Sequence, residues 1–349
     1  MDNLAHALLG AALGRAVAGS KVARAGLLGA VAANAPDWTE WFTGLPGDRV
    51  DRLLLHRGIT HSLAGGLVET IGLTLLVGLG ARWWTRRRGR GVAPPWGWLA
   101  VCIGATVLSH LYMDWQGSYG LRPFLPWSGR WYYGDWVAIV DPFFWLVPLV
   151  ALAWGAERHW MPLTGVAVVG GTMSALLVWR SDVVVPWVFA AYATLCALGA
   201  IGWVRYWFGP VGRRRAATFA LLILALYALA QGGAVQVEKR KVRSAAQRRF
   251  GPEASWAALT VVGHPFAWEP VYANQDTVAG DGWSLPRHLD APAVARAVRE
   301  TREGRAMAQF ARFFVAEADS ANGVTVYLRD ARYTRAGRDG WAVLRVRLD

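Results

Sequence analysis

The stretch His56-Arg57-Gly58-Ile59-Thr60-His61-Ser62 places two histidines and an arginine directly before a long apolar run that begins at Leu63. Residues 63–81 are long enough to cross a membrane as a helix, since the hydrocarbon core requires about 20 apolar residues. The polar stretch therefore lies at the end of a predicted membrane span. Gly58 permits a turn between the two histidines.

Further apolar runs predict a polytopic helical membrane domain. Two shorter pieces, residues 4–18 and 25–35, come first and are rich in small residues, which predicts short helices in close contact. A cleaved signal peptide is disfavoured, because Asp2 replaces a basic start and His6 lies within the first piece. The later predicted spans cover residues 96–113, about 137–155, 162–179, 184–204 and 216–234.

The composition also favours a membrane protein. The chain has 349 residues, 54% of them hydrophobic, which is too apolar for an average soluble domain. The net charge of +13 would fit nucleic-acid binding, but the arginines cluster at the ends of apolar runs, as membrane topology predicts. We therefore expect the lipid bilayer as partner and no nucleic acid. Cys102 and Cys196 lie within apolar runs and predict buried thiols, not a disulfide.

The composition changes near residue 234. We expect residues 1–234 to form the membrane domain and residues 235–349 a basic linker and a small soluble α+β domain. Ala291–Ala318 has helical spacing, whereas residues 325–329 and 342–348 alternate as strands do. Asp339-Gly340 suits a turn between these strands. Residues 38–55, with Trp38, Trp41 and Phe42, resemble an interfacial segment.

Arginine-rich segments predict the orientation of the spans. Residues 82–91 and 205–215 should face the cytoplasm, because basic residues collect in cytoplasmic loops. Counting spans from there places the histidines, the loop 115–135 and the C-terminal domain on the outer face. Lys239-Arg240-Lys241 disagrees with that placement, although long domains often cross regardless of charge.

Imidazoles and carboxylates gather at the predicted outer ends of the helices. His110 and Asp114 are four residues apart, so one helical face carries both. Such residues bind divalent cations, with zinc as first candidate. Each also has a structural explanation, as a hydrogen-bonded pair, a solvated loop or a helix cap. The predicted metal ligands are His6, Asp37, His56, His61, His110 and Asp114, and the choice between His56 and His61 stays open.

Three further residues are candidates for catalysis. Arg57 can bind a phosphate or carboxylate with two parallel donors, or it can pair with Asp51 or helix carbonyls. Asp135 and Asp141 flank the start of a predicted span, and either could act as a general base or an added ligand. A helix cap is the structural alternative for Asp135, and an interfacial charge is the alternative for Asp141.

These segments resemble a known family. Met1-Asp2-x-x-x-His6, Asn34-x-Pro36-Asp37, His56-Arg57-Gly58-x-Thr60-His61-Ser62 and Ser109-His110-x-x-x-Asp114 are similar to the YdjM family of bacterial inner-membrane proteins. That family is described as membrane-bound, metal-dependent hydrolases. The resemblance implies a multi-pass protein of the bacterial inner (cytoplasmic) membrane.

A more remote similarity is to zinc-dependent phospholipase C and the related zinc nucleases. Those enzymes use His, Asp, His and His-x-x-x-Asp in that order, which His6, Asp37, His61 and His110-x-x-x-Asp114 reproduce. A second His-x-x-x-Glu pair, which completes a three-metal cluster there, is missing here. The resemblance therefore implies one or two metal ions.

The residues and the resemblance together predict an integral membrane hydrolase that uses a divalent metal ion. Trp and Tyr around the expected site suit a lipid or lipid-linked substrate, with a phosphoester as first guess. The alternative is a non-catalytic metal-binding scaffold or regulatory protein. A transporter is disfavoured, because the ionisable groups lie at span ends and not at the midplane. The sequence does not define the oligomeric state.

Overall fold

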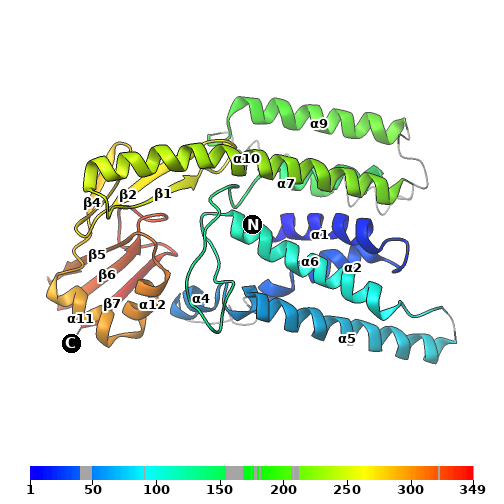
Figure 1. Ribbon diagram of the computed structural model, residues 1–349, viewed down its shortest axis with the longest axis horizontal. Helices are drawn as coiled ribbons and strands as arrows, with labels where there is room; N and C mark the ends of the chain where they lie inside the picture. The colour runs from blue at the N-terminus through cyan, green and yellow to red at the C-terminus, as the bar shows by residue number, and fades with distance from the viewer. Residues whose placement is uncertain are drawn as a thin grey trace. The chain divides into compact units, whose positions relative to one another are not determined.

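The computed structural model describes residues 1–39, 49–89, 91–154, 168–173, 175–176, 179–180, 182–205, 207, 212–320 and 323–348. The chain forms two compact units. Unit 1 comprises Met1–Trp38, Ile59–Gly233 and Thr260–Ala267, and unit 2 comprises Thr39–Gly58, Ala234–Leu259 and Trp268–Asp349. The last helix of unit 1 continues into unit 2 (Figure 1).

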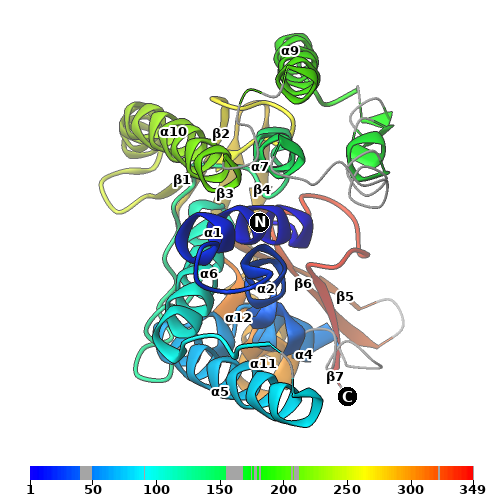
Figure 2. The ribbon, with the colours of Figure 1, turned by 90° about the vertical axis from the view of Figure 1, so that its right-hand side faces the viewer.

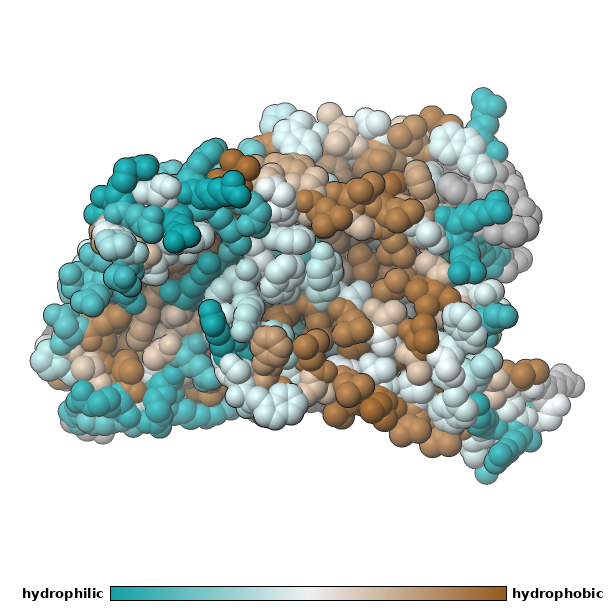
Figure 3. Space-filling view, viewed as in Figure 1, coloured by the Kyte–Doolittle hydropathy of each residue, from teal (hydrophilic) through white to brown (hydrophobic). Residues whose placement is uncertain are grey.

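Unit 1 is helical, as the sequence predicts. Among the described residues, four helices are long and apolar enough to cross a membrane. Their exposed side chains are largely apolar, and Figure 3 shows this brown surface over the helices. The helices of unit 1 for which the structure describes both ends are α1 (Asn3–Ala18), α2 (Ala25–Ala32), α5 (Leu63–Arg88), α6 (Trp96–Gln116), α7 (Pro142–Trp154), α9 (Pro186–Val204) and the first part of α10 (Arg213–Phe250) (Figure 2). The four candidate spans are α5, α6, α9 and α10.

Helix α5 extends further than the sequence predicted. The arginine-rich segment expected as a loop continues the helix to Arg88. Cations stabilise the last turn of a helix, where the carbonyl ends of the peptide dipoles accumulate negative charge. Gly89 then ends the helix in the left-handed conformation, with φ of 61°, which glycine adopts at low cost.

Two other predicted segments differ from the structure. Helix α7 begins at Pro142, not near residue 137, because proline fits the first helical turn and Asp141 precedes it as a cap. The basic segment 238–249, expected as a linker, is helical within α10. It holds no glycine or proline until Gly251-Pro252, which end the helix. Two of the predicted spans are described only in part. Residue 155 of the span 137–155, and residues 162–167, 174, 177 and 178 of the span 162–179, lie outside the described residues.

Glycines set the spacing between α1 and α2. A Cβ atom added to Gly14 would lie 2.2 Å from the carbonyl oxygen of Ala25, and one added to Gly29 would lie 2.2 Å from that of Gly10. Neither position can hold a larger side chain without moving the helices apart. The two short helices are therefore packed by small residues, as membrane helices often are.

Unit 2 is a small α+β domain, and the predicted fold class is confirmed. Its sheets are a four-stranded one in the order β1-β2-β3-β4 and a three-stranded antiparallel one in the order β5-β6-β7. Side chains from both sheets, among them Val271, Phe313 and Val315, share one apolar core. The elements are α4 (Arg49–Leu55), β1 (Ser255–Thr260), β2 (Trp268–Ala273), β3 (Thr277–Gly280), β4 (Trp283–Pro286), α11 (Pro292–Glu300), α12 (Arg302–Phe310), β5 (Phe314–Asp319), β6 (Val324–Asp330) and β7 (Val343–Leu348).

The strand predictions for residues 325–329 and 342–348 are confirmed by β6 and β7. The single helix predicted for Ala291–Ala318 is wrong in extent. Thr301 ends α11 and caps α12 through its hydroxyl oxygen, which accepts from the Gly304 amide at 3.0 Å, and Phe314 begins a strand. The strands β1 to β4 were not predicted. Trp41 and Phe42 of the predicted interfacial segment lie outside the described residues.

The contact between α1 and α2 generates a test. Gly29→Val should lower the thermal unfolding temperature of the detergent-purified protein, because its side chain would overlap the Gly10 backbone. Overpacking of this kind costs about 1–3 kcal/mol or more. Gly72→Val is the matched control, since a Cβ atom there meets nothing within 4 Å on the exposed side of α5. Equal unfolding temperatures for the two variants would contradict the packing.

Candidate metal centre

The first turn of α1 carries His6, and Asp2 fixes where that turn begins. The Asp2 carboxylate accepts from the Ala5 amide at 3.0 Å and from the indole of Trp145 at 2.9 Å. The first contact caps the helix, and the second ties its start to α7. His6 is thereby held as a buried side chain, 1% exposed, within the packed helices.

Asp37 follows α2 in a single 3₁₀ turn, η1 (Ala35–Asp37). Pro36 cannot continue an α-helix, so the chain leaves α2 and turns. The Asp37 amide donates to the Asn34 carbonyl at 3.1 Å and closes this turn. The Asp37 side chain is buried among helices at the point where α2 ends.

His61 closes a second 3₁₀ turn, η2 (Ile59–His61), directly before α5. Ser62 caps α5, because its hydroxyl accepts from the Gly65 amide at 3.0 Å and donates to the Ile59 carbonyl at 2.7 Å. A Cβ atom at Gly65 would overlap the Ile59 carbonyl, so only glycine fits. These contacts fix His61 at the start of the span.

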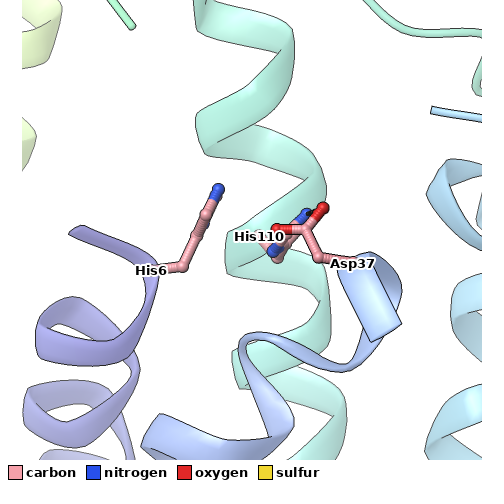
Figure 4. A group of neighbouring side chains, drawn as sticks. All are labelled: His6, Asp37 and His110. Carbon is pink, nitrogen blue, oxygen red and sulfur yellow. Dashed lines mark ion pairs between the residues drawn. The ribbon is translucent and has the colours of Figure 1, made fainter. Parts of the chain in front are cut away.

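His110 and Asp114 lie on one buried face near the end of α6. The Nδ1 atom of His110 is 2.6 Å from the Ala33 carbonyl at the end of α2. A carbonyl only accepts hydrogen bonds, so Nδ1 carries the proton and the lone pair of a neutral ring lies on Nε2. The carbonyl thus sets both the tautomer and the orientation of the ring. Figure 4 shows His110, His6 and Asp37 reaching one space from three elements.

The donor atoms of these five residues converge. His110 Nε2 lies 3.1 Å from His61 Nε2, 3.4 Å from an Asp114 oxygen and 3.6 Å from an Asp37 oxygen. His6 Nε2 lies 3.3 Å from the other Asp114 oxygen, and its ring stacks on that of His110 at 3.8 Å. The donors form two groups that share His110, one with His6 and Asp37, the other with His61 and Asp114.

The spacing and the chemistry of this donor set fit a divalent metal ion. Ligand atoms about 2.1 Å from one tetrahedral ion lie about 3.4 Å apart. The measured separations of 3.1–3.6 Å bracket that value. Among the described residues, the buried Nδ1 atom of His6 has no hydrogen-bond partner. Two buried carboxylates require nearby positive charge, and the Met1 α-amino group supplies one such charge at Asp114. A divalent cation would balance both carboxylates.

For Asp37 and His61, the electrostatics favour the protonation states that metal binding requires. Burial alone would raise the pKa of Asp37, but the hydrogen bond with His61 and the charge of His110 outweigh it and lower the pKa to about 2. Burial lowers the pKa of the His61 imidazole. Near neutral pH, Asp37 is therefore ionised and His61 is neutral, which are the forms that bind a cation.

The remaining predicted site residues are in neither of the two donor groups. The Asp141 carboxylate accepts from the Phe143 amide at 2.9 Å and from the Tyr227 hydroxyl at 2.7 Å. Asp141 therefore caps α7, and a catalytic role for it stays a prediction. Asp135 is fully buried in unit 1, and a catalytic role for it stays a prediction.

His56 and Arg57 belong to unit 2, in the segment that follows α4, and their predicted roles stay predictions. Arg57 is buried and adopts a left-handed backbone conformation, with φ of 51°. Asp51, which the sequence offered as a partner of Arg57, instead forms an ion pair with Arg302.

Two groups near the centre escaped the sequence reasoning. The α-amino group of Met1 donates to Asp114. Glu69, on α5, lies within electrostatic reach of His110 and Asp37, and its buried Oε2 atom has no hydrogen-bond partner among the described residues. A signal for Glu69 was present, since it is the one acidic residue of the apolar run 63–81.

Comparisons with known proteins agree with this architecture. Residues 1–183, which include all five converging side chains, match the family described as YdjM inner membrane protein. No curated protein and no solved structure matches the chain. Because the match covers more than half of the 349 residues and the helices suit a bilayer, the chain belongs to the YdjM family of inner membrane proteins.

Proposed function

We propose that this protein is an integral membrane hydrolase that uses one or two divalent metal ions, with zinc as first candidate. The observation that carries the proposal is the convergence of three imidazoles and two carboxylates at one buried point. The ligands would be His6, Asp37, His61, His110 and Asp114. Nitrogen and oxygen donors of this kind suit zinc.

The bound ion would supply Lewis acidity, which activates water at neutral pH and polarises the bond under attack. The residues of the chain supply orientation. The Ala33 carbonyl holds the His110 ring, and the His61 Nδ1 atom lies 3.1 Å from the Thr60 hydroxyl. When Nδ1 donates to that hydroxyl, Nε2 of His61 carries the lone pair that a cation would bind.

Glu69 is the candidate for proton transfer. Its Oε2 atom is buried and lies near the ligands without being one of them. An acceptor that is not committed to the ion can receive a proton from water and return it to a leaving group. In this proposal Glu69 holds the proton, whereas Asp37 and Asp114 stay ionised as ligands.

The surroundings of the centre favour a lipid or lipid-linked phosphoester as substrate. The loop after α6 carries aromatic side chains that are exposed, with Trp127 80% and Phe124 45% exposed. Aromatic side chains of this kind lie at membrane interfaces. The same loop contacts the start of α5, where the Leu63 amide donates to the Pro123 carbonyl at 2.9 Å. Arg122, beside Pro123 and stacked on Trp131, is a buried cation in this loop and suits a phosphate group.

Metal content tests the centre directly. Protein purified without chelators should contain at least one divalent ion per chain by elemental analysis, and His61→Ala or Asp114→Asn should lose most of it. His264→Ala is the matched control, because this histidine of unit 1 lies in neither donor group. Wild-type protein that holds no metal and takes up none on titration would refute the centre.

Glu69→Gln tests the chemistry. Turnover of phospholipid or p-nitrophenyl phosphoesters should disappear with a chelator and return with zinc. Glu69→Gln should keep the metal and reduce turnover about 100-fold or more, since proton transfer by a positioned side chain contributes about 10²–10⁴-fold. Glu238→Gln, an exchange in α10, should change neither quantity. A metal-loaded protein that hydrolyses none of these esters would favour a metal-binding scaffold.

A further inference from the structure

A cavity lies at the end of the α5–α6 hairpin opposite the candidate metal centre. It has a volume of about 830 Å³ and is formed by the turn between α1 and α2, the last turns of α5 and the first turn of α6. That volume is within the range of about 300–1,000 Å³ that is typical of ligand sites. All of its lining residues belong to unit 1.

The interior of this cavity is apolar. Its walls include Leu28 on α2, Val77 on α5 and Leu99 on α6. Helices α5 and α6 are candidate membrane spans, so the cavity opens among surfaces that contact acyl chains. Leu27 and Trp84 at its edge are 62% and 50% exposed. An occupant must therefore present hydrocarbon to these walls.

The rim of the cavity is cationic. Lys21 and Arg24, both exposed, lie in the turn between α1 and α2, and none of the described residues that line the cavity is acidic. Arg24 has a left-handed backbone conformation, with φ of 57°, in which a non-glycine residue is strained. The arginine-rich last turn of α5 lies at the same end of the hairpin. An occupant must therefore carry an anionic group at its polar end.

We propose that this cavity binds an anionic phospholipid, with an acyl chain against Leu28, Val77 and Leu99 and the phosphate group at Lys21 and Arg24. Basic cavities between membrane helices on the cytoplasmic side suit such headgroups. Trp84 at the rim fits the depth of the headgroup region. The cavity is separate from the metal centre, so the proposal stands whether or not the protein is a hydrolase.

The test is native mass spectrometry of the full-length protein in detergent, titrated with phosphatidylglycerol or with phosphatidylcholine. The wild-type protein should bind phosphatidylglycerol more tightly. The double variant Lys21→Gln/Arg24→Asn should weaken that binding roughly 25-fold, at about fivefold for each basic residue at a membrane surface. Asparagine tolerates the backbone conformation of Arg24, so the variant should fold.

A charge control separates this site from general attraction to cations. Arg213→Gln/Arg215→Gln removes two arginines at the start of α10, which lies at the same end of unit 1 because Arg214 donates to the Ala16 carbonyl at the end of α1. This control should bind phosphatidylglycerol as the wild-type protein does. Equal weakening in both double variants, or equal binding of the two lipids by the wild type, would overturn the proposal.

A steric variant tests the apolar walls independently. Val77→Trp fills the cavity and should abolish the preference for phosphatidylglycerol. Leu76→Trp is the matched control, because Leu76 is 69% exposed and does not line the cavity. Retained tight binding in Val77→Trp would place the lipid elsewhere and overturn the proposal.

Discussion

The buried contact among three imidazoles and two carboxylates is the constraint on which unit 1 depends. His61 and His110 bring their Nε2 atoms within 3.1 Å of each other inside an otherwise apolar bundle. Buried polar groups destabilise a fold unless each forms a hydrogen bond, and buried charges destabilise it unless each is paired with an opposite charge. A divalent cation would meet this requirement, because it accepts nitrogen lone pairs and balances carboxylate charge.

The helices around the centre are arranged to hold these groups at fixed distances. Gly14 and Gly29 allow the backbones of α1 and α2 to come into contact. His6 on α1 and Asp37 after α2 lie in one donor group with His110. The Ala33 carbonyl at the end of α2 orients His110. A change in the spacing of α1 and α2 would therefore also move His6 relative to His110.

The spans α5 and α6 join two chemically different ends. One end carries His61, His110 and the exposed aromatic loop, and the other carries arginines and an apolar cavity with a cationic rim. Aromatic side chains and cations both anchor helices at membrane surfaces, but only cations distinguish the cytoplasmic leaflet. The two ends therefore differ in the lipid chemistry that each can recognise.

Local chemistry explains which parts of the sequence prediction succeeded. Hydropathy and length defined α5, α6 and α9, because a helix in lipid must satisfy its own backbone. The four-residue spacing of His110 and Asp114 placed both on one face of α6. The prediction was wrong for the basic segment 238–249 of α10. Its charges suggested a linker, but its residues favour helix and the helix continues to Phe250.

Hydropathy and residue spacing are sufficient to predict a helical membrane protein with a small α+β domain and with imidazoles and carboxylates at helix ends. Which of those side chains contact one another is seen only in the tertiary structure. Distances between His6, Asp37, His61 and His110 depend on contacts between segments far apart in the chain, which no local pattern encodes. The same holds for Glu69. Its charge is visible in an apolar run of the sequence, whereas its electrostatic interaction with His110 and Asp37 depends on how α5 packs.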